Sequence, residues 1–193
     1  MSDFLRTIAF CATALLWCST APDPSFAGLQ APVNADATAF DAFSKRVAQY
    51  TALQKKITAS LPTVPGTPTP KQIDDYQRAL GVAIIQARKG AKKGDVFGPD
   101  MPALIRRLLA PMFKGPEGAR VRAAISEEPH PVVPAVNVRY PDEVPLSTMP
   151  PDLLKLLPKL EEGLEFRFVD RHLILLDVKS QLIVDVIDNA MPA

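Results

Sequence analysis

The sequence contains very little cysteine, tryptophan or histidine, and this scarcity excludes several kinds of chemistry. Its 193 residues include two cysteines, one tryptophan and two histidines. Cys11, Trp17 and Cys18 lie within residues 1–27, a segment that we expect to be removed. The remaining chain then has no thiol for catalysis, for a cysteine-type zinc site or for an iron–sulfur cluster, and no disulfide. Its stability must therefore come from a packed core.

The sequence also lacks a hydrophobic run long enough to cross a membrane. The apolar run from Thr7 to Trp17 lies between two more polar stretches. A spanning helix needs about 20 apolar residues, so residues 1–27 are interpreted as a signal peptide. Small residues at Ser25 and Ala27 predict cleavage after Ala27 and a periplasmic or secreted protein. Cys18 leaves lipid anchoring as an alternative, which the bulky Trp17 before it disfavours.

Charge is unevenly distributed, although the whole chain carries a net charge of only +1. Residues 28–126 contain 15 Lys/Arg and 7 Asp/Glu, whereas residues 127–193 contain 6 and 12. One interpretation is that a basic half packs against an acidic half. The other is that the basic half contacts an anionic partner, such as lipid headgroups or envelope polymers. Stacking aromatic residues are few, so the sequence does not favour nucleic-acid binding.

Hydrophobic spacing predicts an α+β fold that begins with helices. After a flexible mature N-terminus at residues 28–35, residues 36–129 form the helical part, in which four helices are expected. The expected helix starts are Asp36, Thr69-Pro70, Gly98-Pro99 and Gly115-Pro116. The basic stretch KGAKKGD (residues 89–95) lacks the spacing of a P-loop. It is therefore interpreted as a flexible linker and not as a phosphate-binding loop.

Residues 130–193 are expected to complete the same domain as its β-rich part. Alternation predicts strands at 164–169, 172–177 and 182–187, joined by short turns into an antiparallel meander. Residues 133–140 are a candidate fourth strand, which prolines confine to an edge, where it would also accept a strand from a peptide. A small sheet needs one covered face. The helices are expected to cover that face and to leave the other face open.

The C-terminal region carries a recognisable set of residues, namely Leu164-Glu165-Phe166-Arg167-Phe168-Val169, Arg171, Asp177 and Leu182-Ile183-Val184-Asp185. Together with KKGDVF, ALIRRLLA and VPLSTMPPDLLKLLPKL, this set resembles a family of uncharacterised secreted bacterial proteins. The resemblance covers most of the chain after the signal peptide. It implies the fold and an exported location, and no activity, because none is established for the family. Asp170 stands where the family usually has glycine, which predicts a turn position with positive φ.

A dense set of charges on the predicted strands is the first candidate site. The candidates for binding a ligand or partner are Arg167, Asp170, Arg171, His172 and Asp177. The sequence favours the structural alternative, which is a cross-strand salt-bridge ladder on the open sheet face. In that ladder the two arginines would pair with Asp177 and Asp185.

Two further hypotheses assign chemistry to other residues. A hydrolase of envelope polymers would use paired carboxylates from Glu165, Asp177 and Asp185. A metal-binding periplasmic protein would use His130 and His172, although the sequence has no H-x-x-x-H or H-E-x-x-H spacing. The sequence favours neither. It favours an exported, non-enzymatic protein without a cofactor, which binds an envelope component or a partner protein.

Overall fold

The computed structural model describes residues 34–64, 66–126, 132–147 and 149–192. The expected signal peptide with its cleavage site after Ala27, the segment 28–33 and His130 lie outside the described residues. The described residues belong to one compact unit, Asn34–Ala193. Within the described ranges, no helix combines the length and the apolar character needed to cross a membrane.

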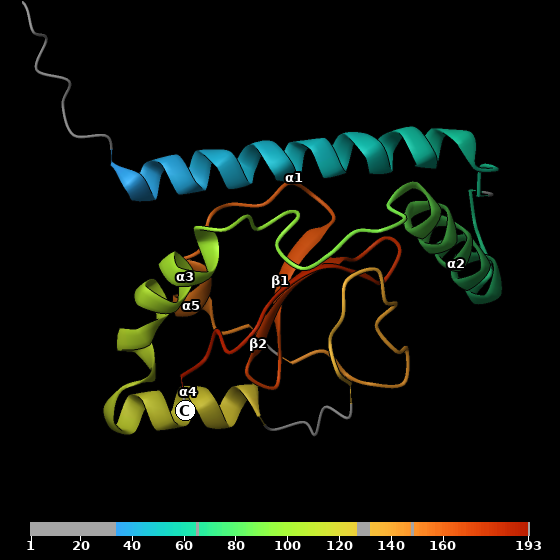
Figure 1. The fold of residues 1–193 in the computed structure, drawn as a ribbon. Coiled ribbons are helices and arrows are strands. Elements are labelled where there is room, and N and C mark those ends of the chain that lie inside the picture. Colours follow the sequence, from blue (N-terminus) through green and yellow to red (C-terminus); the bar gives the residue numbers. More distant parts are fainter. Residues whose placement is uncertain (1–33, 65, 127–131, 148, 193) are drawn as a thin grey trace, which may run out of the picture. The chain divides into compact units, whose positions relative to one another are not determined.

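Helices precede a small sheet in the chain, as Figure 1 shows. The helices are α1 (Ala35–Ser60), α2 (Pro70–Ala87), α3 (Met101–Leu109), the 3-10 helix η1 (Ala110–Phe113), α4 (Gly115–Ile125) and α5 (Pro151–Leu154). The strands are β1 (Leu164–Val169), β2 (His172–Asp177) and β3 (Leu182–Ile187). The predicted α+β class and the antiparallel C-terminal sheet are confirmed. The expected four helices are not quite matched, because η1 follows α3 directly and the short α5 is added.

The helix starts follow from side-chain capping. Asn34, not Asp36, caps α1, and its side chain accepts hydrogen bonds from the N–H groups of Asp36 (3.1 Å) and Ala37 (3.4 Å). Asp36 lies in the first turn and pairs with Arg107 at 2.6 Å. Thr69 caps α2 in a capping box, as the sequence predicts. The predicted start of α3 at Gly98-Pro99 is too early, because these residues remain in the preceding turn.

The sheet has the order β1-β2-β3, with each neighbouring pair antiparallel. Asp170, in the turn between β1 and β2, has φ of 53°, so the positive φ expected there is confirmed. The register of β2 and β3 shifts between Leu175 and Leu176. This bulge inserts Val184 between the partners of those two residues, Asp185 and Ile183. It allows both Val184 and Asp185 to face the helical side of the sheet.

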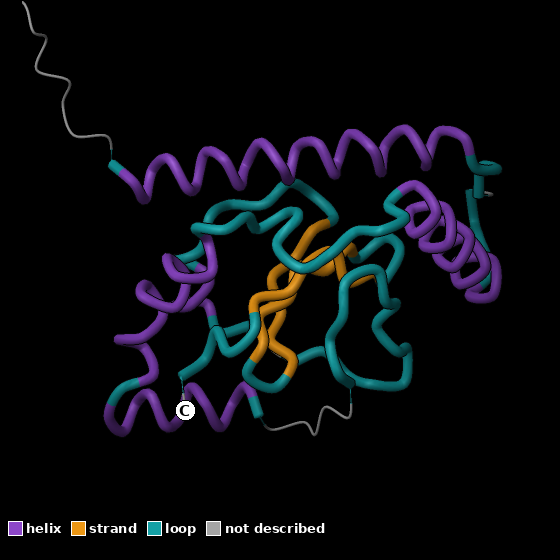
Figure 2. The backbone as a smooth tube through the Cα atoms, in the orientation of Figure 1, coloured by secondary structure: helices purple, strands orange, loops and turns teal. Residues whose placement is uncertain are grey.

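Both faces of the sheet are covered, so the expected open face is wrong. The main core joins residues of α1 to α4 to one sheet face, and it contains the stacked rings of Phe43, Phe97 and Phe166. A second core covers the other face and contains Tyr140, Val169, Ile174, Leu176, Ile183 and Val186. Partly buried side chains of the irregular segment 132–146 pack on this second core. That segment forms part of the loop trace in Figure 2.

The candidate fourth strand forms only an isolated bridge. Arg139 bridges to Leu182 next to β3. Backbone hydrogen bonds also join Asn137 N to Ile183 O (2.9 Å) and Tyr140 N to Gln181 O (2.7 Å). Residues 137–140 therefore cover the outer edge of β3. The expectation that this segment accepts a strand from a peptide stays a prediction, because β3 occupies only one of its two edges.

Replacing Asp170 by glycine should stabilise the fold. A non-glycine residue in the left-handed region costs about 1–2 kcal/mol, less for Asp than for most residues, and glycine avoids this cost. We expect Asp170→Gly to raise the free energy of unfolding by about 0.5–1 kcal/mol, measured by denaturant unfolding. The matched control is Lys179→Gly, at an exposed turn position without positive φ. Glycine there should destabilise, and a loss of stability in both variants would contradict the expectation.

Candidate functional site

The charged groups of the predicted binding cluster do not lie together in the structure. Asp170 is exposed at the tip of the turn between β1 and β2. The Nε of Arg171 donates a hydrogen bond to the backbone oxygen of Met191 (3.3 Å) and so holds the C-terminal segment. His172 lies 2.9 Å from a carboxylate oxygen of Asp188, measured from Nδ1 to Oδ1. These three residues therefore have separate local contacts.

Arg167 and Asp177, the other two members of the cluster, lie on opposite faces of the sheet. Arg167 forms an ion pair with Glu165, two residues earlier on the same strand. Asp177 is fully buried and faces α1. The five predicted binding residues are therefore not brought together into one surface.

Asp177 is a buried acceptor for four donors. The hydroxyl of Tyr50 and the Nε2 of Gln54, both on α1, donate to its Oδ2 at 2.6 Å. The backbone N–H groups of Lys179 (2.9 Å) and Ser180 (3.3 Å) donate to its Oδ1. A carboxylate is tolerated in a core when its oxygens are satisfied in this way. Asp177 therefore joins α1 to the turn between β2 and β3.

Asp185 is the second buried carboxylate, and it organises a loop. Its oxygens accept hydrogen bonds from the N–H groups of Gly94, Val96, Phe97 and Val186, each at 2.8 Å. Successive backbone N–H groups that converge in this way form an anion-binding nest. The stretch predicted to be a flexible linker therefore ends in a turn that binds an anion. That anion is the side chain of Asp185.

These contacts overturn the salt-bridge ladder and remove the geometry required by the carboxylate hypothesis. Asp177 and Asp185 are each fully buried and are bonded to different segments, whereas Glu165 pairs with Arg167. A hydrolase that used these three residues would need at least two of their carboxylates to converge on an accessible pocket, and they do not. Among the described residues, no group of three or more His, Cys, Asp and Glu side chains is arranged to hold a metal ion. His130 lies outside those residues.

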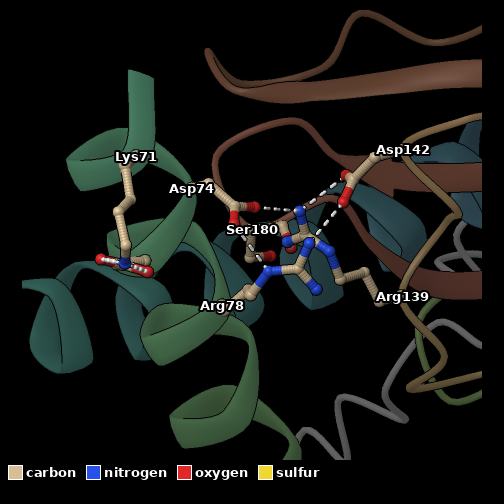
Figure 3. Close-up of polar contacts among 7 residues, drawn as sticks. Lys71, Asp74, Arg78, Arg139, Asp142 and Ser180 are labelled. Atoms are coloured by element: carbon tan, nitrogen blue, oxygen red, sulfur yellow. Dashed lines mark hydrogen bonds and ion pairs between the residues drawn. The ribbon is translucent and has the colours of Figure 1, made fainter. Parts of the chain in front are cut away.

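One charge cluster of the described chain joins two arginines to two aspartates, as Figure 3 shows. Arg78 pairs with Asp74 and with Asp142, each at 2.8 Å. Arg139 pairs with Asp142 at 2.7 Å and donates to the backbone oxygen of Ser180 at 3.1 Å. The hydrogen bond from Arg78 lowers the pKa of Asp74. Because the two arginines face two aspartates, this cluster fastens α2 to residues 139–142 and carries no net charge.

Ion pairs also join the basic and acidic halves of the sequence. They include Lys55–Glu161 (3.7 Å), Arg78–Asp142 (2.8 Å) and Lys93–Asp188 (2.6 Å). These ion pairs agree with the first interpretation of the charge asymmetry, in which the basic half packs against the acidic half. Other cations of the basic half are not paired in this way.

A shallow hollow with unpaired cations lies between α1, the end of α2 and the loop after it. We call it the basic pocket; its volume is about 370 Å³, and its lining includes Arg46, Arg88, Lys89 and Asp95. No ion pair or hydrogen bond of the Arg46 side chain occurs within the described ranges. Asp95 accepts a hydrogen bond from the N–H of Lys92 (2.8 Å). The lining thus has three cations and one carboxylate.

Arg88 is the partly buried member of the basic pocket. Its guanidinium donates to Asn137 Oδ1 (2.9 Å) and to Val184 O (3.0 Å), both neutral acceptors. Its Cζ lies 5.2 Å from the centre of the Tyr50 ring, in a cation–π contact. Burial lowers the pKa of Arg88, and the nearby Tyr50, Asp185 and Asp95 act in the opposite direction. No carboxylate of the described chain forms a salt bridge with it.

Comparison of the chain with protein-family models, with curated proteins and with solved structures gave no match. The resemblance to a family of secreted bacterial proteins therefore stays a prediction.

Sequence reasoning missed the contacts of Tyr50 and Arg88. Tyr50 is buried on α1, and a buried hydroxyl needs a hydrogen-bond partner. That need was a usable signal, but the sequence does not say that Asp177 meets it. Arg88 directly follows α2, where the sequence alone shows only a cation that suits the helix dipole. Its position over Tyr50 depends on tertiary packing.

Tyr50 should make stability sensitive to alkaline pH. Burial, and then the charge of Asp177 and the hydrogen bond to it, raise the pKa of Tyr50 far above its ordinary value. This contribution to stability is fully present below the unfolded pKa of about 10 and is lost above it, because only the unfolded chain then releases the proton. The wild type should lose about 1.4 kcal/mol more per pH unit above pH 10 than Tyr50→Phe loses.

Denaturant unfolding between pH 7 and 11 measures this difference. At pH 7, Tyr50→Phe should cost about 1.5–3 kcal/mol, because it removes a hydrogen bond to a buried carboxylate. The control is Tyr76→Phe, whose hydroxyl makes no hydrogen bond within the described residues. It should change the stability at pH 7 by no more than about 0.5 kcal/mol. Parallel pH profiles for the wild type and Tyr50→Phe would show that Asp177 does not hold the phenol.

Proposed function

We propose that the protein is an exported, non-enzymatic binding protein that recognises an anionic component of the cell envelope at the basic pocket. The observation that supports this most is the unpaired charge of Arg46, Arg88 and Lys89 around one hollow. Cations of a folded protein are commonly neutralised by nearby acids, as Arg78 and Arg139 are here. A group of cations without such partners favours an anionic ligand.

The surroundings of Arg88 support the same proposal. A partly buried guanidinium is costly unless an anion or well-placed acceptors compensate its lost hydration. Asn137, Val184 and the ring of Tyr50 supply only neutral partners. A bound phosphate or carboxylate group would add a charge-assisted hydrogen bond, which is about twice as strong as a neutral one.

The shape of the basic pocket limits what it would bind. Its volume of about 370 Å³ is close to the lower limit for ligand pockets, about 300 Å³. Such a hollow suits one compact oxyanion group and not a large apolar ligand. We therefore propose the phosphate or carboxylate group of an envelope lipid or polymer as the ligand.

Small oligo-anions test the proposal directly. Pyrophosphate and citrate, added at constant ionic strength, should raise the midpoint of thermal unfolding as mass action predicts. Dye-based detection suits this protein, because its one tryptophan lies in the expected signal peptide. Arg46→Gln should weaken binding about tenfold, equivalent to about 1.4 kcal/mol, by removing one charge-assisted contact.

The matched control is Lys45→Gln, one residue earlier on α1 at an exposed ion pair with Asp41. It removes the same charge outside the basic pocket and should change the affinity less than about twofold. Equal losses in Arg46→Gln and Lys45→Gln would mean that the anions respond to the overall charge. A screen without any shift, repeated with polyanionic envelope fragments, would remove the support for this ligand class.

A further inference from the structure

A second hollow with basic side chains is lined by the same loop as the basic pocket, the loop between α2 and α3. We call it the loop hollow; its volume is about 430 Å³, and residues 92–95 and 186–188 belong to its lining. The lining contains three cations and two carboxylates, namely Lys92, Lys93, Arg106, Asp95 and Asp188. The loop hollow is therefore a further place where an anion could meet several cations.

The three cations of the loop hollow differ in their partners. Lys93 pairs with Asp188 at 2.6 Å. The guanidinium of Arg106 donates to the backbone oxygens of Asp188 (2.7 Å) and Asn189 (3.2 Å), which are neutral acceptors. Lys92 is exposed, and its side chain has no ion pair or hydrogen bond within the described residues. Two of the three cations thus form no salt bridge with a described carboxylate.

The basic pocket and the loop hollow adjoin each other. Asp95 belongs to the lining of both. Arg46 of the basic pocket also lies against Gly98 of the loop hollow, since a Cβ added to this glycine would be only 2.8 Å from the Cζ of Arg46. Gly98 has φ of 78°, a conformation that favours glycine. The guanidinium of Arg46 is therefore placed at the border between the two hollows.

The backbone of the shared loop is already occupied by an anion of the protein. The N–H groups of Gly94, Val96 and Phe97 donate to the buried carboxylate of β3, each at 2.8 Å. An external anion would therefore be bound by side chains and not by the backbone nest. The same three hydrogen bonds hold the loop in place, so the lysines and arginines around it project from a fixed backbone.

The combined charge of the two hollows indicates the class of ligand. Their linings together contain six Lys/Arg side chains and two carboxylates, Asp95 and Asp188. A single phosphate group carries at most about two negative charges. The excess of four positive charges is therefore better matched by several linked anionic groups. Phosphate has more acceptor oxygens than carboxylate, so one phosphate at the border could contact cations of both hollows.

The apolar surface of the protein favours a polymer over a membrane. Segments that lie on anionic membranes combine basic side chains with apolar ones that enter the lipid. The large hydrophobic side chains that are exposed in the described chain line neither hollow; they are Ile73, Val82, Val133, Val138 and Leu154. A linear polymer needs no such apolar contact, because charged side chains suffice to hold it.

We propose that the basic pocket and the loop hollow together bind successive phosphate groups of one linear anionic polymer. This inference rests on the proposed function, which concerns one anionic group at the basic pocket, and adds the second site and the polymer. Arg46 contacts the group at the border, and Lys92 and Arg106 bind the next group along the chain. Once one group is bound, binding of the next is intramolecular, so the affinity rises with chain length.

Isothermal titration calorimetry with pyrophosphate and with inorganic polyphosphate tests the proposal on the purified protein. Both are added at constant ionic strength, and concentrations are expressed per phosphate unit. Polyphosphate should bind at least about tenfold more tightly than pyrophosphate. Lys92→Gln with Arg106→Gln should weaken polyphosphate binding at least about fivefold and leave pyrophosphate binding within about threefold. Pyrophosphate binding by this double variant also shows that it is folded.

A single variant and its matched control test the location without disturbing the contacts of Arg106. Lys92→Gln alone should weaken polyphosphate binding at least about threefold. Lys114→Gln removes an exposed lysine between η1 and α4, outside both hollows, and should change this affinity less than about twofold. Equal losses in the two variants would overturn the proposal, because polyphosphate would then respond only to overall charge.

The two anions separate this inference from the proposed function. Pyrophosphate binding without tighter binding of polyphosphate would overturn the inference and leave the proposed function standing. Absence of binding by both anions would overturn both. Phosphatidylglycerol vesicles provide the membrane arm of the test, measured by co-sedimentation. Tighter binding to vesicles than to polyphosphate, per phosphate and weakened by Lys92→Gln, would assign the surface to a membrane and overturn the polymer.

Discussion

The two buried carboxylates of the sheet are the interaction on which the rest of the structure depends. Asp177 binds the side chains of α1, and Asp185 binds the backbone of the loop that precedes α3. Each is fully buried and each accepts four hydrogen bonds at or below 3.3 Å. Removing such an acceptor leaves several buried donors unsatisfied. These aspartates therefore determine where the helical layer meets the sheet, and their chemistry is structural.

The candidate binding surfaces follow from this constraint. Asp185 and the buried ring of Phe97 fix the loop that forms one wall of the basic pocket. Tyr50, held by Asp177, lies beneath the guanidinium of Arg88. Asp185, a buried acid near Arg88, is bonded to four backbone N–H groups and forms no salt bridge with this arginine. Residues 137–140 cover the outer edge of β3 and contact Arg88 through Asn137.

Local patterns in the sequence predicted the strands and turns, because these depend on neighbouring residues. The positive φ of Asp170 was predicted from the family resemblance, in which glycine stands at this position. The direction of Asp177 and Asp185 was not predictable, because their partners lie about 90 to 127 residues away. The bulge at Val184 brings Asp185 to the helical side of the sheet. An alternating pattern of apolar residues does not reveal where such a bulge lies. One signal was overlooked: β3 is apolar at five of six positions, as expected for a strand buried on both faces.

Hydrogen exchange of the Gly94, Val96 and Phe97 amides tests most directly whether Asp185 organises the loop. In the wild type, these three amides should exchange only through openings nearly as costly as global unfolding. In Asp185→Asn, these three amides should exchange at least about a hundredfold faster. The exchange rates of amides in the middle of α1 should rise only by the factor that corresponds to the loss in global free energy of unfolding. Rapid exchange in the wild type, or unchanged exchange in the variant, would contradict the account. The loop would then be ordered without the carboxylate.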